Sequence, residues 1–461
     1  MNKLKNNKKL LLSFALMNSF FATAQLTPHA MDSIHKITEL DYAQMLGQLG
    51  IKQSEIRSGV SGNPGDANAA NRFEEKVNQY TLPDALVLNN GKKLNNAKDW
   101  WSLRRPEIVE DFDKEIYGRL PKNIPAVKWV IVAVKDTVIG NYKAKEKVLK
   151  GIVDNTAYPD LNVEIDLEIV TPAGAVSAVP VVMEFGFFHT FGKVGINTPN
   201  GIGYAGEPSW KEQLLSRGWG YSIIEPYSFQ ADNGAGLNSG IIGLVNKGRP
   251  RKPDDWGALR AWAWGAGKAM DYFETDKDID AKRVAVEGIS RYGKAAIVAM
   301  AYDTRFSLAF VGSSGAGGTK ILRRVFGEQV ENLASSGEYH WFCGNFIKYT
   351  SKLTPDNLPV DAHELVALCA PRPVFISAGS PQVEGQWVDA KGTFLGGVNA
   401  GPVYRLLGKK DLATTIFPNI GMPLVDGEIA FRQHAGGHST GPNWSTWIAW
   451  ATKYWGVTKY D

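Results

Sequence analysis

The chain has 461 residues, of which 44% are hydrophobic and 21% charged, and its formal net charge is +4. These are globular values, and the length suits one large or two ordinary domains. The small, dispersed positive charge argues against a nucleic-acid-binding protein, and the sequence carries no basic stripe and no heptad repeat. The 14 Trp residues are a high count; aromatic side chains often line carbohydrate pockets, although most Trp are simply core.

The first 24 residues have the organisation of a signal peptide. Four Lys residues within the first nine positions precede an apolar run at residues 10–24, which ends in Ala-Thr-Ala ahead of Gln25. This run is short for a membrane span, and no later stretch is long enough for one. Because no Cys follows the cleavage position, a lipoprotein anchor is not expected. We expect the mature protein to be exported, to the periplasm or outside the cell.

Residues 25–80 are polar, with Gly, Asn, Asp and Ser clusters, and we expect them to form an arm or wrapping segment. Ordered structure is predicted from there on, as one catalytic domain at residues 81–461 that opens with a β-hairpin around Asn89-Asn90-Gly91. Strands are predicted at residues 129–134, 148–153, 163–170, 180–187, 220–225, 283–287, 308–312, 373–378 and 428–433, and helices at 100–116, 208–217, 256–273 and 444–455. Strands that first lie close together and then alternate with helices predict an α/β fold with a mixed, mostly parallel sheet covered on both faces.

Residues 283–294, RVAVEGISRYGK, join an apolar strand, a tight turn at Gly288-Ile289-Ser290 and an Ala-rich helix. A strand, a sharp turn with a central Ser and a helix form the nucleophile elbow of α/β-hydrolases. In the usual G-x-S-x-G spelling a second Gly follows two residues after the Ser; here Tyr292 takes that place and Gly293 comes one residue later. A Gly-x-Ser turn is common and often has no functional role. The strand before this turn and the helix after it make Ser290 the predicted nucleophile.

The catalytic His of this fold follows the nucleophile and the last strands, which leaves His434 and His438 in FRQHAGGHSTGPNW. His438 follows Gly436-Gly437, and such a pair allows a tight loop to bring an imidazole over Ser290. His434 ends a predicted strand and could equally be structural. We therefore predict that His438 is the base.

The catalytic acid of this fold usually lies in the loop after the predicted strand at residues 373–378. That loop reads GSPQVEGQWVDAKG and offers Glu384 and Asp389. Either could be an ordinary solvated carboxylate. Glu384 is nearer the strand and is our choice for the residue that orients the His and stabilises its cation.

No cofactor or metal is predicted. There is no H-E-x-x-H motif and no Cys cluster, and Asp361 with His363 is too sparse a ligand set. Cys343 and Cys369 are the only cysteines, and the sequence does not decide between two buried thiols and one disulfide.

Several long motifs in order resemble the glucuronoyl esterases of carbohydrate esterase family 15, over most of residues 82–455. The most specific is the G-x-S-R-x-G-K elbow. The others are LRRPEIVEDF with YGR at residues 117–119, DWGALRAWAWGAGKAMDY from Asp255, SGAGG at residues 314–318, HELVALCAPRPV from His363, and GPVYRLLG at residues 401–408. The resemblance implies an α/β-hydrolase that cleaves the ester between glucuronic acid on xylan and lignin alcohols.

The resemblance also implies site residues. Arg291 would stabilise the oxyanion, Lys294 and Glu328 would bind sugar hydroxyls, and Trp387 would flank the uronate. Each residue has a plainer alternative. Arg291 and Lys294 could be surface charges and Glu328 a charge on a helix face, while Trp387 could simply pack within its loop.

The sequence differs from the family pattern at the acid. Many members carry a Glu just before SGAGG, where this chain has Ser313; others have an Asp two residues before the Trp, where this chain has Gly385. Glu384, the residue before Gly385, would then be the catalytic acid from a backbone position shifted by one residue. Ser313 cannot offset an imidazolium charge.

We therefore expect a serine esterase that acts as a monomer on glucuronoxylan or lignin–carbohydrate esters. It is expected to bind no nucleic acid and, once mature, not to insert in a membrane. Two alternatives stay open from the residues. An acetyl-xylan or other carbohydrate esterase would use the same triad but leave Arg291, Lys294 and Glu328 idle. A catalytically weakened carbohydrate-binding relative would keep the pocket without hydrolysis.

Overall fold

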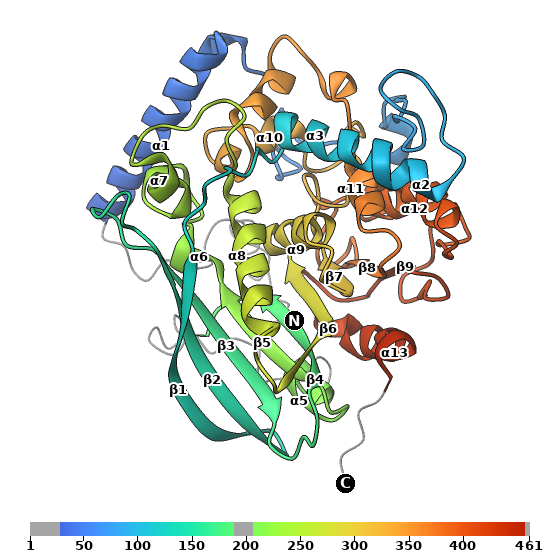
Figure 1. Ribbon diagram of the computed structural model, residues 1–461. Helices are drawn as coiled ribbons and strands as arrows, with labels where there is room; N and C mark the ends of the chain where they lie inside the picture. Colours follow the sequence, from blue (N-terminus) through green and yellow to red (C-terminus); the bar gives the residue numbers. More distant parts are fainter. Residues whose placement is uncertain (1–27, 189–205, 457–461) are drawn as a thin grey trace, which may run out of the picture.

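A nine-stranded sheet runs through the part of the chain that the computed structural model describes, residues 28–188 and 206–456. Its order is β1-β2-β3-β5-β4-β6-β7-β8-β9 (Figure 1). The pairs from β1 to β3 and the β3–β5 pair are antiparallel, and all pairs from β5 through β4 to β9 are parallel. The strands are β1 Val127–Ile139, β2 Tyr142–Val153, β3 Glu164–Pro172, β4 Val179–Phe185, β5 Gly220–Glu225, β6 Ile279–Ile289, β7 Leu308–Gly312, β8 Val374–Ala378 and β9 Ile429–Gln433.

Every predicted strand is present, and the predicted mixed, mostly parallel sheet is confirmed. The largest differences are in β1 and β2, which extend beyond their predicted bounds because the two pair along most of their length. The backbone hydrogen bonds of an antiparallel pair continue through polar residues, so a strand prediction based on runs of apolar residues ends too early. The predicted hairpin at Asn90 is a short turn, closed by an isolated antiparallel bridge between Val87 and Lys93.

Alternate residues of the parallel strands enter two separate cores, one on each face of the sheet. Val284 and Val286 of β6 enter one core, whereas Ala285 between them enters the other. The first face is covered by α8 Ala258–Phe273, α9 Arg291–Tyr302, α11 Ala362–Leu368 and α12 Ala390–Leu406, and the second by α5 Trp210–Leu215 and α13 Trp444–Trp455. Both faces are buried, as the near-continuous apolar runs of these strands require.

The remaining helices lie outside these layers. They are α1 Pro28–Leu49, α2 Ala97–Asp99, α3 Arg105–Glu115, α6 Pro226–Phe229, α7 Ile241–Asn246 and α10 Val330–Leu333. The predicted helix at residues 100–116 is a π-helical turn, Trp100–Arg104, that continues into α3. The 3₁₀ turns are Gln53–Glu55, Glu74–Lys76, Gly234–Asn238, Tyr339–Trp341, Gly344–Thr350, Pro355–Asn357 and Gly441–Asn443.

The 22-residue helix α1 was not predicted from the sequence. It packs against later parts of the chain: its residues Tyr42 and Met45 are buried, and the Tyr42 hydroxyl donates to the Ala334 carbonyl at 3.0 Å. The expected signal peptide at residues 1–24 lies outside the described residues. Of the helices described in the structure, none has the length and apolarity needed to cross a membrane.

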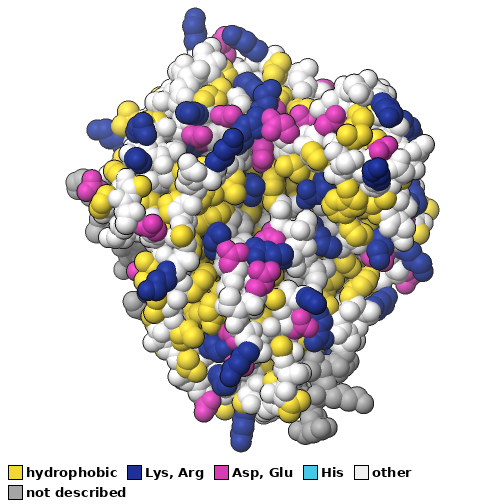
Figure 2. Space-filling model, viewed as in Figure 1, with side chains coloured by type: hydrophobic (Ala, Val, Ile, Leu, Met, Phe, Trp, Pro, Cys, Tyr) yellow, Lys and Arg dark blue, Asp and Glu magenta, His cyan; other side chains and the backbone are white. Residues whose placement is uncertain are grey.

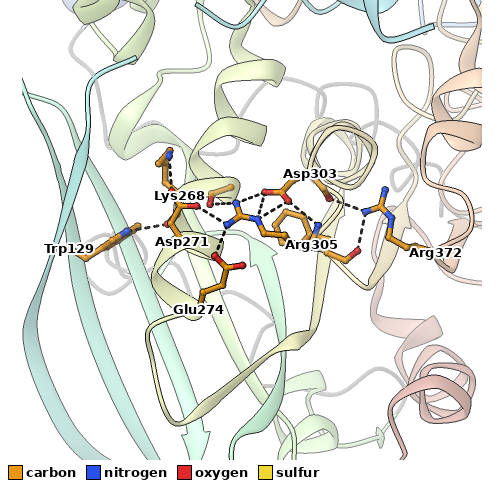
Figure 3. Close-up of polar contacts among 9 residues, drawn as sticks. Trp129, Lys268, Asp271, Glu274, Asp303, Arg305 and Arg372 are labelled. Carbon is orange, nitrogen blue, oxygen red and sulfur yellow. Dashed lines mark hydrogen bonds and ion pairs between the residues drawn. The ribbon is translucent and has the colours of Figure 1, made fainter. Parts of the chain in front are cut away.

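Charged side chains of both signs are interspersed on the face drawn in Figure 2, which matches the small net charge. Figure 3 shows an ion-pair network at the end of the sheet where β6, β7 and β8 begin. Arg305 donates to Asp303, to Asp271 at 2.8 Å and to Glu274 at 3.0 Å, which ties the segment before β7 to α8. Arg372 donates to the Asp303 carbonyl at 2.9 Å.

Cys343 and Cys369 are both buried, free thiols, so the disulfide alternative is wrong. Burial raises the pKa of each thiol to about 12, which keeps both protonated at neutral pH.

Candidate active site

Ser290 lies on the turn between β6 and α9 with φ 60° and ψ −128°. A non-Gly residue seldom adopts this conformation, and such strain concentrates at functional sites. The Ser290 N–H donates to the Gly312 carbonyl at 2.9 Å, which fixes the turn against the end of β7.

The close approach of the elbow to β7 explains the position of its glycines. A Cβ at Gly288 would lie 2.2 Å from the Tyr292 carbonyl oxygen, and one at Gly293 would lie 2.6 Å from the Gly312 carbonyl oxygen. Only Gly fits at either position. The second small residue is therefore needed one position later than in the usual spelling, and Tyr292 is free to pack against Trp262 and Phe187.

His438 and Glu384 meet on two adjacent loops. The Nδ1 atom of His438 lies 2.6 Å from Oε1 of Glu384. The carboxylate is nearly fully buried, with 2% of its side chain exposed, whereas the imidazole is 44% exposed. The other carboxylate oxygen, Oε2, accepts a hydrogen bond from the Gly379 N–H at 2.5 Å. A buried, doubly held carboxylate behind a half-exposed imidazole is the arrangement that orients a catalytic His.

The two loops are joined by their backbones. The Ser380 N–H donates to the Gly436 carbonyl at 2.9 Å, and the His434 N–H donates to the Ala378 carbonyl at 2.9 Å. A Cβ at Gly379 would lie 2.7 Å from the Gly437 carbonyl oxygen and 2.8 Å from the Glu384 Cβ. Gly379 therefore permits the approach that brings Glu384 to His438.

The alternative candidates have other partners. Asp389 is buried at the N-terminus of α12, where it accepts from the Gly392 N–H at 2.9 Å and pairs with Arg324 at 2.8 Å. His434 is buried, and its Nδ1 accepts from the Gly436 N–H at 3.1 Å. Ser313 follows β7 with φ 43°, and its buried Oγ has no hydrogen-bond partner among the described residues.

Arg291, the residue after Ser290, is held by a buried carboxylate that sequence reasoning missed. Its guanidinium pairs with Asp232, whose Oδ1 accepts from Trp341 Nε1 at 2.5 Å and from His340 Nε2 at 2.9 Å. Burial by itself would raise the pKa of Asp232, but Arg291 and His340 outweigh it and hold that pKa well below its ordinary value. Asp232 lies in a Gly/Asn-rich loop 59 residues before Arg291, so no local pattern links the two.

Lys294 and Glu328 form a buried ion pair one helical turn past Ser290. The Lys294 Nζ lies 3.1 Å from Glu328 Oε2 and donates to the Ser314 carbonyl at 2.8 Å. Oε2 also accepts from the Ala316 N–H at 3.1 Å, within the SGAGG segment. The ring of Trp341 packs beside both cations, 5.5 Å from Arg291 and from Lys294.

Trp387 is half-buried and adjoins this pair through its backbone. The Glu328 N–H donates to the Trp387 carbonyl at 2.9 Å. Gly327 has φ +56°, and a Cβ there would lie 2.3 Å from the Trp387 carbonyl oxygen, so Gly is required where the two loops meet. The structure thus brings together Arg291, Lys294, Glu328 and Trp387 beside the elbow.

Within residues 28–188 and 206–456, no group of three or more His, Cys, Asp or Glu side chains could hold a metal ion. A mostly parallel sheet, a Ser on a strained turn after one of its central strands and a His–carboxylate pair on two later loops define an α/β-hydrolase.

Comparison with known proteins gives the family. A family model described as glucuronyl esterase, fungi, matches residues 251–408. Carbohydrate esterase MZ0003, from an unknown prokaryotic organism, is 36% identical over 407 residues, which are 83% of this chain and 91% of that protein. A CE15 glucuronoyl esterase from Teredinibacter turnerae T7901 superposes with a TM-score of 0.84 at 41% identity, over 91% of this chain and 100% of that one. A glucuronoyl esterase from Solibacter usitatus superposes with a TM-score of 0.73 at 36% identity, over 83% of this chain and 100% of that one.

The chain therefore belongs to carbohydrate esterase family 15, and it is a carboxylic ester hydrolase. The predicted family resemblance and α/β-hydrolase fold are confirmed.

Proposed function

We propose that the protein is an exported serine esterase that hydrolyses the ester between 4-O-methyl-glucuronic acid of xylan and lignin alcohols. The observation that carries the proposal is the 2.6 Å contact between His438 and Glu384, together with the strained elbow at Ser290. The names of the family relatives as glucuronoyl esterases support the substrate class. The signal-peptide pattern of residues 1–24 supports export, and a monomer remains our expectation.

The reaction is a two-step acyl transfer. Ser290 Oγ attacks the C6 carbonyl of the uronate ester while Nε2 of His438 takes its proton. Glu384, at Nδ1, stabilises the imidazolium that forms. His438 then protonates the departing alcohol, and it later activates the water that releases the uronic acid from Ser290.

Arg291 stabilises the charge that develops on the carbonyl oxygen. Its bond to Asp232 uses Nη1, and the described residues give no partner to Nε or Nη2, which remain as donors toward the oxyanion. The Asp232 carboxylate fixes the guanidinium before the substrate arrives, so little reorganisation is needed during the reaction.

Lys294 and Glu328 bind sugar hydroxyls. An ammonium group has three N–H donors, and Lys294 uses two, on Glu328 and Ser314. Glu328 holds Lys294 and Ala316 through Oε2, which leaves Oε1 as an acceptor. The half-buried Trp387 supplies a ring beside the same pair, and an apolar wall with a few placed polar groups suits a sugar.

Hydrolysis of benzyl glucuronate and of an acetylated xylooligosaccharide, by the parent and by Ser290→Ala, tests the proposal. Activity on the uronate ester alone, abolished in the variant, is the expected result. Activity on the acetyl ester alone would make the protein an acetyl esterase. No hydrolysis of either, with retained uronate binding, would instead indicate a carbohydrate-binding protein.

A further inference from the structure

Residues 59–78, here called the rim segment, follow α1 and lie beside the two loops that carry Glu328 and Trp387. The segment closes on itself, since the Ser61 N–H donates to the Asn68 carbonyl at 2.9 Å and the Ala70 N–H donates to the Ser61 carbonyl at 2.8 Å. It has no strand or α-helix of its own, apart from the 3₁₀ turn Glu74–Lys76. Its polar composition suggested only an arm, but its contacts are specific.

The rim segment pairs with the backbone just before Glu328. Asn78 accepts from the Val325 N–H at 2.8 Å through Oδ1 and donates to the Arg323 carbonyl at 3.0 Å through Nδ2. Asn71 donates to the Val325 carbonyl at 2.9 Å, and its own carbonyl accepts from the Gly327 N–H at 2.9 Å. Asn71 and Asn78 therefore pair with backbone groups of residues 323–327, a stretch that lies outside any strand or helix. These hydrogen bonds fix the position of the backbone that leads into Glu328.

The same segment contacts the loop of Trp387. A Cβ at Gly62 would lie 3.6 Å from the Trp387 ring, so the rim backbone passes along one edge of the indole. Gln386, the residue before Trp387, donates to the Arg72 carbonyl at 3.3 Å. The segment thereby limits where the Trp387 side chain can lie.

Glu74 joins the stretch before Glu328 to the first turn of α12, the helix that follows the loop of Trp387. Its carboxylate pairs with Arg324, four residues before Glu328, and with Lys391 at 2.7 Å, four residues after Trp387. Partial burial by itself would raise the pKa of Glu74, but Lys391 and Arg324 outweigh it and hold that pKa below its ordinary value, so the carboxylate stays charged at neutral pH. One exposed side chain of the rim thus links the stretch before Glu328 to the helix that follows the loop of Trp387.

We propose that the rim segment is a positioning element that sets the affinity of the site for the uronosyl sugar, with Glu74 and Asn78 as its positioning residues. The inference rests on the proposed function. Glu328 and Trp387 hold each other through one backbone hydrogen bond, and the rim supplies additional contacts to both loops. Among the described contacts of residues 59–78, none reaches Ser290, Glu384 or His438. Loss of a rim contact should therefore weaken sugar binding and leave the acyl-transfer step intact.

The test measures kcat and KM of the full-length protein on benzyl glucuronate for Glu74→Ala, Asn78→Ala and Asn78→Asp. The substitution Asn78→Asp keeps the acceptor for Val325 but places a carboxylate oxygen against the Arg323 carbonyl, so it should also raise KM. We expect KM to rise about five- to tenfold in the two Ala variants, as for one or two lost hydrogen bonds, and kcat to stay within about twofold. Glu75→Ala is the matched control, because Glu75 is exposed, adjacent to Glu74 and without a hydrogen bond or ion pair among the described residues.

A second substrate, p-nitrophenyl acetate, has no sugar, and its kcat/KM should not change in any variant. Thermal unfolding is recorded for each. A variant with lowered Tm but the KM of the parent would show a merely structural role and overturn the inference, as would a KM that rises equally in Glu75→Ala. A parent that does not hydrolyse benzyl glucuronate would refute the proposed function, whereas an active parent with unchanged KM in all variants would refute the rim inference alone.

Discussion

Glu384 divides its two carboxylate oxygens between two tasks. Oε1 faces Nδ1 of His438, and Oε2 is held by the Gly379 N–H. This buried anchor brings a carboxylate after β8 to the His, whereas Ser313 occupies the position after β7 where many family members carry a Glu.

We predict that Glu384→Gln lowers kcat on benzyl glucuronate by about two to four orders of magnitude, because an amide cannot offset the charge of an imidazolium. KM should change little. Gln382→Ala, an exposed change in the same loop, is the control. A Glu384→Gln variant with the kcat of the parent would refute Glu384 as the acid.

Glu338 gives a prediction for pH. Burial, and next the neighbouring Glu328, raise its pKa from an ordinary 4.5 to about 8, against the opposing effect of Lys294 and Arg291. Its buried Oε2 has no hydrogen-bond partner among the described residues. Because the folded protein binds this proton more tightly than the unfolded chain, the stabilising contribution is full below pH 4.5 and is lost as pH rises through about 8.

Glu338→Gln stays neutral at every pH. The Tm of the parent should fall as the pH rises from 5 to 9, because Glu338 ionises. The Tm of Glu338→Gln should fall by a few degrees less over the same range. Scanning calorimetry across this range measures the difference, with Glu75→Gln as the exposed control. Parallel Tm curves for parent and Glu338→Gln would contradict the prediction.

At the scale of the elements, the end of β7 joins the two halves of the site. The Gly312 carbonyl accepts the Ser290 N–H, while a Cβ at Gly312 would lie 2.4 Å from Cγ2 of Thr440, two residues after His438. Burial raises the pKa of Glu287 of β6, and the nearby Thr440 side chain opposes that rise. The loop that carries His438 is thus pressed onto the strand that anchors the elbow.

We predict that Gly312→Ala lowers kcat about tenfold, because the added methyl group displaces Thr440 and with it His438; a small misplacement of a catalytic group can cost this much. The double variant Gly312→Ala/Thr440→Ser should recover most of the activity, since Ser lacks Cγ2 and keeps the hydroxyl. Gly174→Ala, where a Cβ meets no atom within 4 Å, is the control. Failure of the double variant to recover activity would refute this steric account.

At the scale of the whole molecule, the sheet is held at the end opposite Ser290 by the network of Figure 3. Arg372 is half-buried there and donates to the carbonyls of Met300, Asp303 and Phe306. Arg305, 32% exposed, makes its ion pairs at the surface.

We predict that Arg372→Ala lowers the free energy of unfolding by roughly 2–4 kcal/mol, since three partly buried carbonyls lose a charged donor. Arg305→Ala should cost at most about 1 kcal/mol, because exposed ion pairs are screened by solvent. Urea unfolding measures both. Both variants should keep the KM of the parent, and a larger loss in Arg305→Ala than in Arg372→Ala would contradict the prediction.

The sequence by itself determined where the strands and the elbow lie along the chain, but not the order of the strands in the sheet. Apolar runs such as residues 283–287 and the turn at Gly288-Ile289-Ser290 are local signals, because strand burial and backbone strain depend on neighbouring residues. It did not reveal α1, whose 22 residues are too polar to show a clear apolar stripe and are stabilised by distant partners such as Ala334.

Only the tertiary structure decided which side chains meet. Glu384 and Asp389 are five residues apart in one loop, yet the first contacts His438 and the second Arg324. Asp232 reaches Arg291, and Glu74 reaches Arg324, across long stretches of chain. Such pairs leave no periodic trace in the sequence, because the packing of separate loops at the ends of the strands creates them.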